Sequence, residues 1–343
     1  MIKPRTQFKK IRAIRKNSLF CILFFMAISL SNAQEGIPIY HDYFADNLYL
    51  LHPSMAGASI KNKIRLTARQ QWFSENEAPN VQTLSLSARI NEASAVGGIV
   101  YNDQNGFNSQ TGGYLTYAHH LQFSRSPVDL NQLSFGLSAG VIQSSLDETN
   151  FNAGDFDPVV AGIVRSSSYF NVDFGMSYNF LNWATHFTVK NLIFQNRGLF
   201  SEEFESANQR RYVFSTGYTW DKKDWAYEPS VLFQWVERTS EKAIDLNFKV
   251  YRTLDFGTLW GGLSYRRSFD GAEFQDGTEI DEQKLQFVTP VLGVNYNKFL
   301  FAYTYSYQVG TIRFESGGFH QLTLGYDFGK REEPYDCKCP AVN

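Results

Sequence analysis

The sequence has few cysteines and, over most of its length, no long apolar run. Only three of the 343 residues are cysteine, too few for a domain held together by disulfides. Beyond residue 33 no stretch of about 18 apolar residues occurs, which excludes a transmembrane helix there. Aromatic residues are abundant instead, and 30 Phe, 19 Tyr and 6 Trp exclude a disordered chain.

The first 33 residues differ from the rest in charge and hydropathy. They carry seven basic residues and no acidic one, then an apolar run over 19–30, then Ser31-Asn32-Ala33. This order predicts a secretory signal peptide over 1–33, cleaved before Gln34, with an apolar run too short to span a membrane. The remaining chain holds 25 basic and 34 acidic residues, a formal net charge of −9, which argues against a nucleic-acid partner.

Apolar and polar residues alternate with a period of two through most of the remaining chain. Between 170 and 180, every second residue is Phe, Val, Met or Tyr, a pattern typical of β-strands. Most segments are longer than the roughly five or six residues of soluble strands and match the roughly 9–11 that cross a bilayer. Fourteen strands are predicted, at 60–71, 80–90, 94–103, 111–123, 130–142, 169–179, 183–190, 210–220, 224–236, 241–252, 257–269, 286–296, 299–308 and 318–328.

The connections between these segments are alternately short and long. One set is mostly short, whereas the other includes 143–168, 191–209 and 270–285. Short periplasmic turns and long extracellular loops are typical of transmembrane β-barrels, and an even number of strands leaves both termini in the periplasm. We therefore predict an all-β fold, an antiparallel up-and-down barrel of about 14 strands over 60–328 in the outer membrane. A soluble β-sandwich is the alternative.

The side chains of such a wall are expected to divide between lipid and lumen. Lipid is predicted to contact Phe170, Phe174, Phe248, Phe301 and Tyr305. Aromatic residues near strand ends are expected to form belts at the membrane interfaces: Trp72, Trp183, Trp220, Trp225, Trp235, Trp260, Tyr265 and Tyr296. Charged residues at alternate positions are expected in the lumen, where mixed signs favour ion pairs over an open ion channel: Arg65, Arg69, Arg89, Asp173, Lys190, Arg211, Glu228, Asp245, Lys249 and Arg266.

Two segments lie outside the predicted barrel. In 34–59 the residues Pro38, Pro53 and Gly57 interrupt any alternation, so this segment is expected to plug the lumen or to lie across the periplasmic mouth. The tail over 329–343 is expected in the periplasm and contains Cys337 and Cys339. These two cysteines could form a disulfide, supply two soft metal ligands, or simply lie in an exposed tail that contacts a periplasmic partner.

No motif of catalysis or of cofactor binding appears in the sequence, so we predict neither an active site nor a cofactor or metal site. A partner site is expected instead in the three long loops, because exposed apolar residues usually mark interaction surfaces. A closed barrel has no free sheet edge, which leaves the rims, loops or lumen for a partner. The candidate partner-binding residues are Phe151, Phe156, Val159, Val160, Phe194, Phe200, Phe204 and Phe274.

The order of several short motifs resembles the PorP/SprF family of outer-membrane proteins of the type IX secretion system of Bacteroidetes. Asn47-Leu-Tyr-Leu-Leu-His-Pro-Ser-Met-Ala-Gly57 is similar to the family's N-P-A-Y-A-G stretch, with His52 in place of the Asn. Further matches follow in the same order, among them Gln71-Trp72, Tyr117-Ala-His-His120, Leu133-Ser-Phe-Gly-Leu-Ser-Ala-Gly140, Lys190-Asn-Leu192, Leu263-Ser-Tyr-Arg266 and Ser316-Gly-Gly-Phe-His-Gln321.

The resemblance implies a non-enzymatic role in protein secretion and gliding motility. Its expected partners are membrane lipid, a secreted cell-surface protein such as an adhesin, and periplasmic ring and peptidoglycan-linked components of the secretion machinery. The chain would anchor such surface proteins or assist their export. On fold alone, a passive porin or small-molecule transporter is the alternative, since fold does not fix function.

Overall fold

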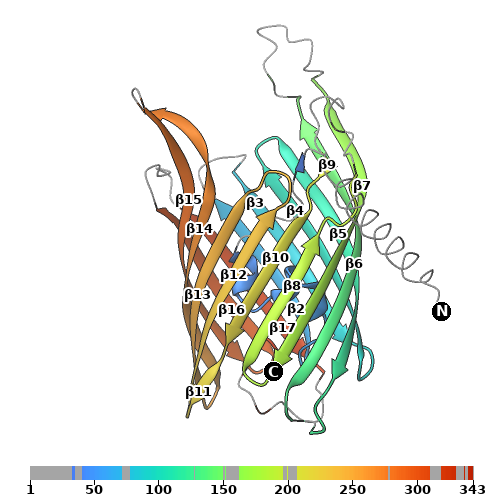
Figure 1. Cartoon of the computed structure of the whole chain (residues 1–343), viewed down its shortest axis with the longest axis vertical. Helices are drawn as coiled ribbons and strands as arrows, with labels where there is room; N and C mark the ends of the chain where they lie inside the picture. The colour runs from blue at the N-terminus through green and yellow to red at the C-terminus, as the bar shows by residue number, and fades with distance from the viewer. Residues whose placement is uncertain are drawn as a thin grey trace, which may run out of the picture.

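The alternating segments form long strands that pair with both neighbours and close into a barrel, seen from the side in Figure 1. In this computed structural model the strands are followed in chain order around the wall. The residues that the structure describes are 33–34, 41–71, 78–126, 128–149, 151, 162–195, 199, 207–276, 279–309, 318–329, 336 and 339–342. The predicted signal peptide therefore lies almost wholly outside the described residues.

Fourteen positions make up the wall, as the sequence predicts. Two short pieces, β1 (Ala33–Gln34) and β9 (Ala207–Asn208), pair separately from the barrel. The wall strands are β2 (Asn62–Gln71), β3 (Asn80–Arg89), β4 (Ser94–Asn105), β5 (Asn108–Gln122), β6 (Asn131–Asp147), β7 (Val164–Phe180), β8 (Trp183–Lys190), β10 (Arg211–Tyr218) continued by β11 (Trp220–Lys222), β12 (Trp225–Val236), β13 (Lys242–Leu254), β14 (Gly257–Asp276), β15 (Glu279–Tyr296), β16 (Phe299–Val309) and β17 (Phe319–Phe328).

Closure of the barrel comes from the first and last strands. Each wall strand pairs antiparallel with the next along the chain, and β17 pairs with β2 from Phe319↔Gln71 to Phe328↔Asn62. Both β10 and β11 pair with β12, so together they fill one position. The predicted antiparallel barrel of 14 strands is confirmed. No helix among the described residues is long and apolar enough to cross a membrane.

Strands take up most of one predicted loop and both ends of another, so the predicted bounds of these two loops are wrong. β14 and β15 stay paired as far as Asp276↔Glu279, which makes most of 270–285 a β-hairpin, with a register shift between Arg267 and Gly271. In the same way β6 and β7 stay paired as far as Asp147↔Val164, which takes both ends of 143–168 into the sheet. Figure 1 shows that both hairpins project beyond the other strands at the same end of the barrel, which we call the long-loop end.

The two faces of the wall differ in polarity in the predicted sense. Leu115, Phe248 and Leu292 are among the large apolar residues exposed on the outer face, at 76%, 43% and 68%. Phe170, Phe174 and Phe301 are also exposed there, and Tyr305 is half-buried on the same face of its strand. The charged residues predicted for the lumen are instead buried or half-buried: Arg65, Arg69, Arg89, Asp173, Lys190, Arg211, Glu228, Asp245, Lys249 and Arg266.

The aromatic belt is clearest at the end of the barrel where the connections are short, the short-turn end. Trp183, Trp220, Trp225 and Tyr296 are exposed there, next to these turns. Trp260 is an exception, and its predicted place in the belt is wrong. It is buried inside the barrel and its Nε1 donates to Asn295 Oδ1 at 3.0 Å. Trp72 lies outside the described residues.

The difference between the faces makes a testable prediction for two neighbouring residues of β13. Phe248→Arg places a charge on the lipid face, where arginine costs about 2–4 kcal/mol near the midplane. We expect poor membrane assembly, measured as loss of the folded band in unheated electrophoresis. Asn247 is buried on the other face, and Asn247→Ala, its matched control, is expected to assemble normally. Equal behaviour of the two variants would contradict the register of β13.

Candidate functional site

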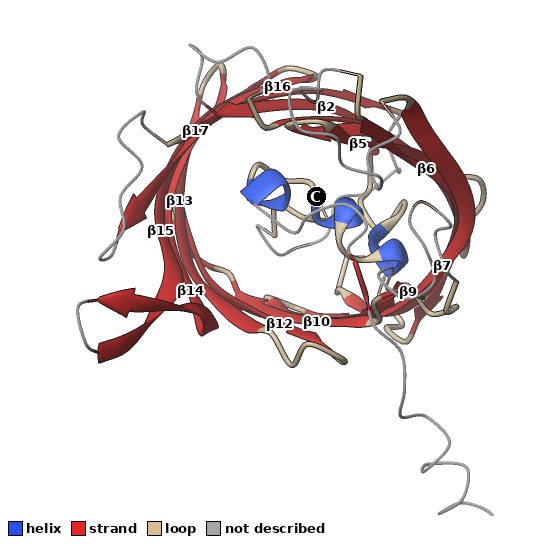
Figure 2. Ribbon diagram, turned by 90° about the horizontal axis from the view of Figure 1, so that it is seen from above, coloured by secondary structure: helices blue, strands red, loops and turns tan. Residues whose placement is uncertain are grey.

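The described residues from 41 to the first wall strand lie inside the barrel. Residues 41–58, here called the plug segment, contain three 3-10 turns, η1 (His41–Phe44), η2 (Leu48–Leu50) and η3 (Pro53–Met55), which Figure 2 shows within the ring of strands. Most of its side chains are buried, among them Tyr43, Phe44, Asn47, Tyr49, Leu50, Leu51, His52, Ser54 and Met55. The site is therefore a lumen filled with protein.

The local sequence explains why this segment turns and does not extend. Pro53 occupies the first position of η3, where its fixed φ suits a helical turn and its missing N–H is not needed. Gly57 has a φ of +61°, a left-handed conformation that favours glycine. At Gly136 of β6 the plug backbone packs directly against the wall, and an added Cβ there would lie 2.2 Å from the carbonyl carbon of Pro53. Only glycine lets the plug backbone come this close.

Side chains of the plug segment hydrogen-bond to separate parts of the wall. The Tyr43 hydroxyl donates to Asp245 Oδ2 of β13 at 2.6 Å. Asn47 Nδ2 donates to Ser85 Oγ of β3 at 3.1 Å. The Tyr49 hydroxyl donates to Thr116 Oγ1 of β5 at 2.7 Å. Strands far apart in the ring are thus joined through one short segment.

His52 connects the plug segment to a further side of the barrel. Its Nδ1 lies 2.9 Å from Thr188 Oγ1 and its Nε2 lies 2.8 Å from Ser215 Oγ, while its ring stacks on His186 at 5.0 Å. Burial, together with the nearby His186 and Lys190, lowers the pKa of His52 well below its usual value. The imidazole is therefore neutral, and its two nitrogens join the plug segment to hydroxyl groups of β8 and β10.

Main-chain carbonyl groups of the plug segment accept hydrogen bonds from the wall. Lys190 Nζ donates to the Leu50 carbonyl at 3.0 Å, and Arg89 Nε donates to that of Gly57 at 2.9 Å. His120 Nε2 lies 3.0 Å from the Ala56 carbonyl. These contacts satisfy carbonyl groups that have no strand partner, and leaving such groups unpaired when buried costs about 1–3 kcal/mol each.

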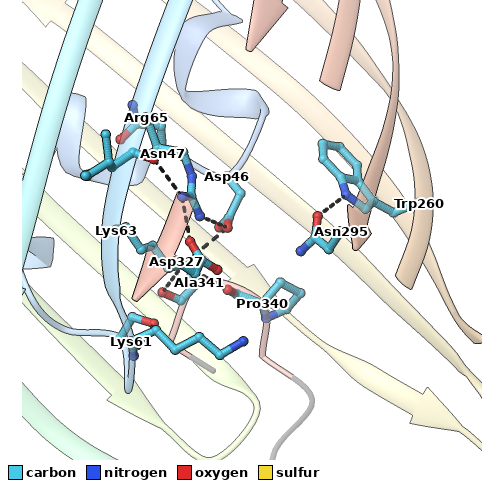
Figure 3. Close-up of polar contacts among 12 residues, drawn as sticks. Asp46, Asn47, Lys61, Lys63, Arg65, Trp260, Asn295, Asp327, Pro340 and Ala341 are labelled. Atoms are coloured by element: carbon cyan, nitrogen blue, oxygen red, sulfur yellow. Dashed lines mark hydrogen bonds and ion pairs between the residues drawn. The ribbon is translucent and has the colours of Figure 1, made fainter. Parts of the chain in front are cut away.

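A cluster of charges fixes the middle of the plug segment to the first and last wall strands (Figure 3). Asp46 Oδ2 lies 3.2 Å from Lys63 Nζ and 3.4 Å from Arg65 Nη2. Arg65 also binds Asp327 of β17, with Nη1 2.6 Å from Oδ1. Burial acts to raise the pKa of Asp46, but the charges of Lys63 and Arg65 outweigh it and lower that pKa. Asp46 is therefore ionised at neutral pH.

The end of the chain packs against the same cluster. Ile60 N–H donates to the Val342 carbonyl at 2.8 Å, Val342 is 1% exposed, and Lys63 Nζ donates to the Pro340 carbonyl at 3.4 Å (Figure 3). Cys339 is half-buried and forms a disulfide, while Cys337 lies outside the described residues. A small cleft lies between the plug, this tail and strands β8, β10 and β12.

Comparison with known protein families assigns this chain to one of them. A family profile described as type IX secretion system membrane protein PorP/SprF matches residues 32–326. The chain belongs to the PorP/SprF family. The resemblance predicted from the motifs is thereby confirmed, and the most extensive of those motifs, residues 47–57, forms most of the plug segment. The barrel and the PorP/SprF family together support the outer membrane as its location.

One solved structure supports the same fold for this PorP/SprF chain, and a second is also similar. It is similar to the deltaS2 mutant of the TodX monoaromatic hydrocarbon channel, with a TM-score of 0.50 at 10% identity over 85% of this chain and 95% of that one. The CymD monoaromatic hydrocarbon channel gives a TM-score of 0.49 at 9% identity over 82% and 91%. Such low identities show the fold alone. No curated protein matches the chain in sequence.

The residues predicted to bind a partner do not form one described patch. Phe151 packs edge-to-face on Phe107, with ring centroids 4.9 Å apart. Phe194 is exposed, and the Arg210 guanidinium lies 4.4 Å from its ring centre. The backbone of Phe274 pairs with Asp281 in the β14–β15 hairpin, which Figure 2 shows across the barrel from β7. Phe156, Val159, Val160, Phe200 and Phe204 lie outside the described residues.

The described part of this PorP/SprF chain offers no group of three or more His, Cys, Asp or Glu residues placed to hold a metal ion. Its buried histidines are bonded to hydroxyl and carbonyl groups, as in the pair His186 Nδ1 and Ser177 Oγ at 2.8 Å. What its side chains do is hold the plug segment across the lumen.

Proposed function

We propose that this PorP/SprF protein is a non-enzymatic outer-membrane component that holds a secreted protein at the cell surface or assists its export. The filled lumen carries this proposal. Hydrogen bonds join the plug segment to β3, β5, β8, β10 and β13, so the path that a porin would offer to solutes is occupied. Binding must then involve the rims of the barrel.

The long-loop end is the surface that we assign to the cell exterior. Transmembrane barrels place short turns in the periplasm and long loops outside, and the connections here divide in that way. With an even number of strands, both ends of the barrel sequence then lie on the periplasmic side. The secreted partner, such as an adhesin, would contact the long-loop end, where the β6–β7 and β14–β15 hairpins project.

The short-turn end would face the rest of the secretion machinery. The tail over 339–342, of which only Val342 is buried, and the cleft beside it give this end a surface to which the plug segment and the tail both contribute. Periplasmic ring and peptidoglycan-linked components of the secretion system are the partners that the family suggests for this surface. Cys337 and Cys339 are the residues we propose for such contact.

Deletion of the gene from the bacterium that encodes it tests the proposed function. We expect one or more surface proteins to appear in the culture medium, or to be retained inside the cell, measured by quantitative mass spectrometry of both fractions. Complementation with the whole chain is expected to restore the surface fraction. A deletion strain with an unchanged surface proteome and a reduced uptake of small solutes would contradict the proposal and support a passive porin.

A further inference from the structure

The wall is not fully paired at the long-loop end of β7. β7 pairs with β6 along its entire length, from Asn131↔Phe180 to Asp147↔Val164. On its other side it pairs with β8 only from Phe174↔Val189 to Phe180↔Trp183, because β8 has eight residues. The expectation that a closed barrel leaves no free sheet edge is therefore wrong for this strand. Among the described residues, no strand pairs with β7 on the β8 side over residues 164–173.

A hydrogen-bond network ends β8 beside Asp173 of β7. Asn191 has a φ of +56°, its N–H donates to Asp173 Oδ1 at 2.9 Å, and its side chain bridges Asn171 and the Gln209 carbonyl. These buried contacts fix where the strand stops. The end of β8 is thus fixed by buried side-chain contacts and not by chance fraying of the strand.

The hydrogen bonds at Val172 and Phe170 show which main-chain groups of β7 point to the β8 side. Leu192 N–H donates to the Val172 carbonyl at 2.8 Å, and Phe170 N–H donates to Gln195 Oε1 at 3.0 Å. The main-chain groups of the even-numbered residues therefore point to the β8 side. Beyond Phe170, no hydrogen bond reaches this edge at Val164, Ser166 or Ser168 among the residues that the structure describes.

Small, exposed side chains leave room for a chain beside this unpaired part. Val164, Ser166 and Ser168 are all exposed, and two of the three side chains are only hydroxymethyl groups. On its other edge β7 pairs with β6, and Arg165 of β7 forms an ion pair with the buried Glu148 at 3.1 Å. A rigid strand with free donors and acceptors is the surface to which an extended peptide adds as a further strand.

We propose that the edge of β7 over residues 164–168 binds an extended segment of the secreted partner by strand addition. The proposal rests on the proposed function and names its contact site. Main-chain hydrogen bonds give the affinity, and the small side chains of Ser166 and Ser168 make the contact tolerant of the partner's sequence. The segment must be short, because Gln195 and Leu192 occupy the edge next to it.

A second copy of this chain in the same membrane cannot pair antiparallel with this edge. Antiparallel pairing of two β7 edges would invert one barrel relative to the other, and copies inserted into one membrane share one orientation. The β8 wall also begins at Val189, beside Phe174, so a bulky neighbour cannot follow the edge further. An extended segment that enters from the exterior meets neither obstacle.

Proline at the even positions tests this proposal, since proline removes an N–H and is tolerated at a free edge. Ser166→Pro combined with Ser168→Pro removes two donors on the β8 side and leaves the bonds to β6 intact. The probe is the surface protein that the deletion strain releases, quantified on cells and in medium. We expect its surface retention to fall on the order of tenfold. The control, Ser166→Ala with Ser168→Ala, keeps both donors and is expected to retain it.

The outcomes separate this inference from the function on which it rests. Retention by an assembled proline variant, when the deletion strain releases the protein, overturns the edge as the site and leaves the proposed function standing. Retention by the deletion strain overturns both. Should the proline variant fail to assemble, amide hydrogen exchange of the unmodified complex decides: slowed exchange at 164–168 relative to the free barrel supports strand addition, and unchanged exchange overturns it.

Discussion

A barrel without residues 41–58 is expected to conduct ions steadily in a planar bilayer, whereas the whole protein is expected to stay closed. The plug segment occupies the lumen and is bonded to strands around the ring. Its removal would expose a wall lined with Asp173, Lys190, Asp245 and Lys249, a polar interior that water fills. Single-channel recording of the purified proteins is the measurement.

The wall keeps its own ion pairs after this deletion, such as Lys190 with Asp173 at 3.9 Å, so we expect the barrel to fold. Assembly is checked by gel electrophoresis, in which a folded barrel migrates more slowly after heating. Closure of the lumen is checked by a second measurement. Thr188, now fully buried under His52, is replaced by Cys and should react with a small thiol reagent only when the plug is absent. His52→Asn is the control and should remain closed. A folded deletion barrel that stays closed and unreactive would contradict the plug.

The strands could be predicted from the sequence because the membrane imposes the pattern. One face of each strand contacts lipid and the other lines a polar lumen, so a period of two persists for as long as the strand lies in the bilayer. Phe299, Phe301 and Tyr303 of β16 show this directly, since they are exposed while Leu300 and Ala302 are buried. The 14 positions and their order follow from this alternation alone.

The projecting hairpins could not be predicted because both of their faces lie outside the bilayer. Between Gly271 and Lys284 the backbone of β14 and β15 remains paired, but the sequence there has no apolar alternation to reveal it. The free edge of β7 could not be predicted from the sequence for a related reason. It depends on where β8 stops, which is set by Asn171, Asp173 and Asn191 and not by any change in hydropathy.

For the lumen, the sequence indicates that residues 34–59 do not form a strand but not what they bind. Tyr43 and Asp245 are 202 residues apart, and His52 and Thr188 are 136 apart. Nothing in either local sequence points to its partner, since the contact depends on the closed shape of the barrel. The same holds for Val342, which is buried against the first part of the chain.

The second large effect is expected from Asp245→Asn. Asp245 is fully buried and accepts Arg266 Nε and Nη2, each at 2.6 Å, as well as the Tyr43 hydroxyl. The amide leaves the Arg266 cation buried without its carboxylate, and breaking one side of such a pair costs about 3–5 kcal/mol. We expect a loss of this size in the free energy of unfolding, measured by urea titration of the barrel in phospholipid vesicles.

Two further variants show whether the loss belongs to the pair. Asp221 is exposed on β11, and Asp221→Asn is expected to change the free energy of unfolding by less than about 0.5 kcal/mol. Adding Arg266→Gln to Asp245→Asn removes the uncompensated charge, so the double variant should be less destabilised than the sum of the single ones. Strict additivity would mean that the two residues stabilise the wall independently. Because Tyr43 shares Asp245, the single variant should also loosen the start of the plug and raise the conductance of the barrel.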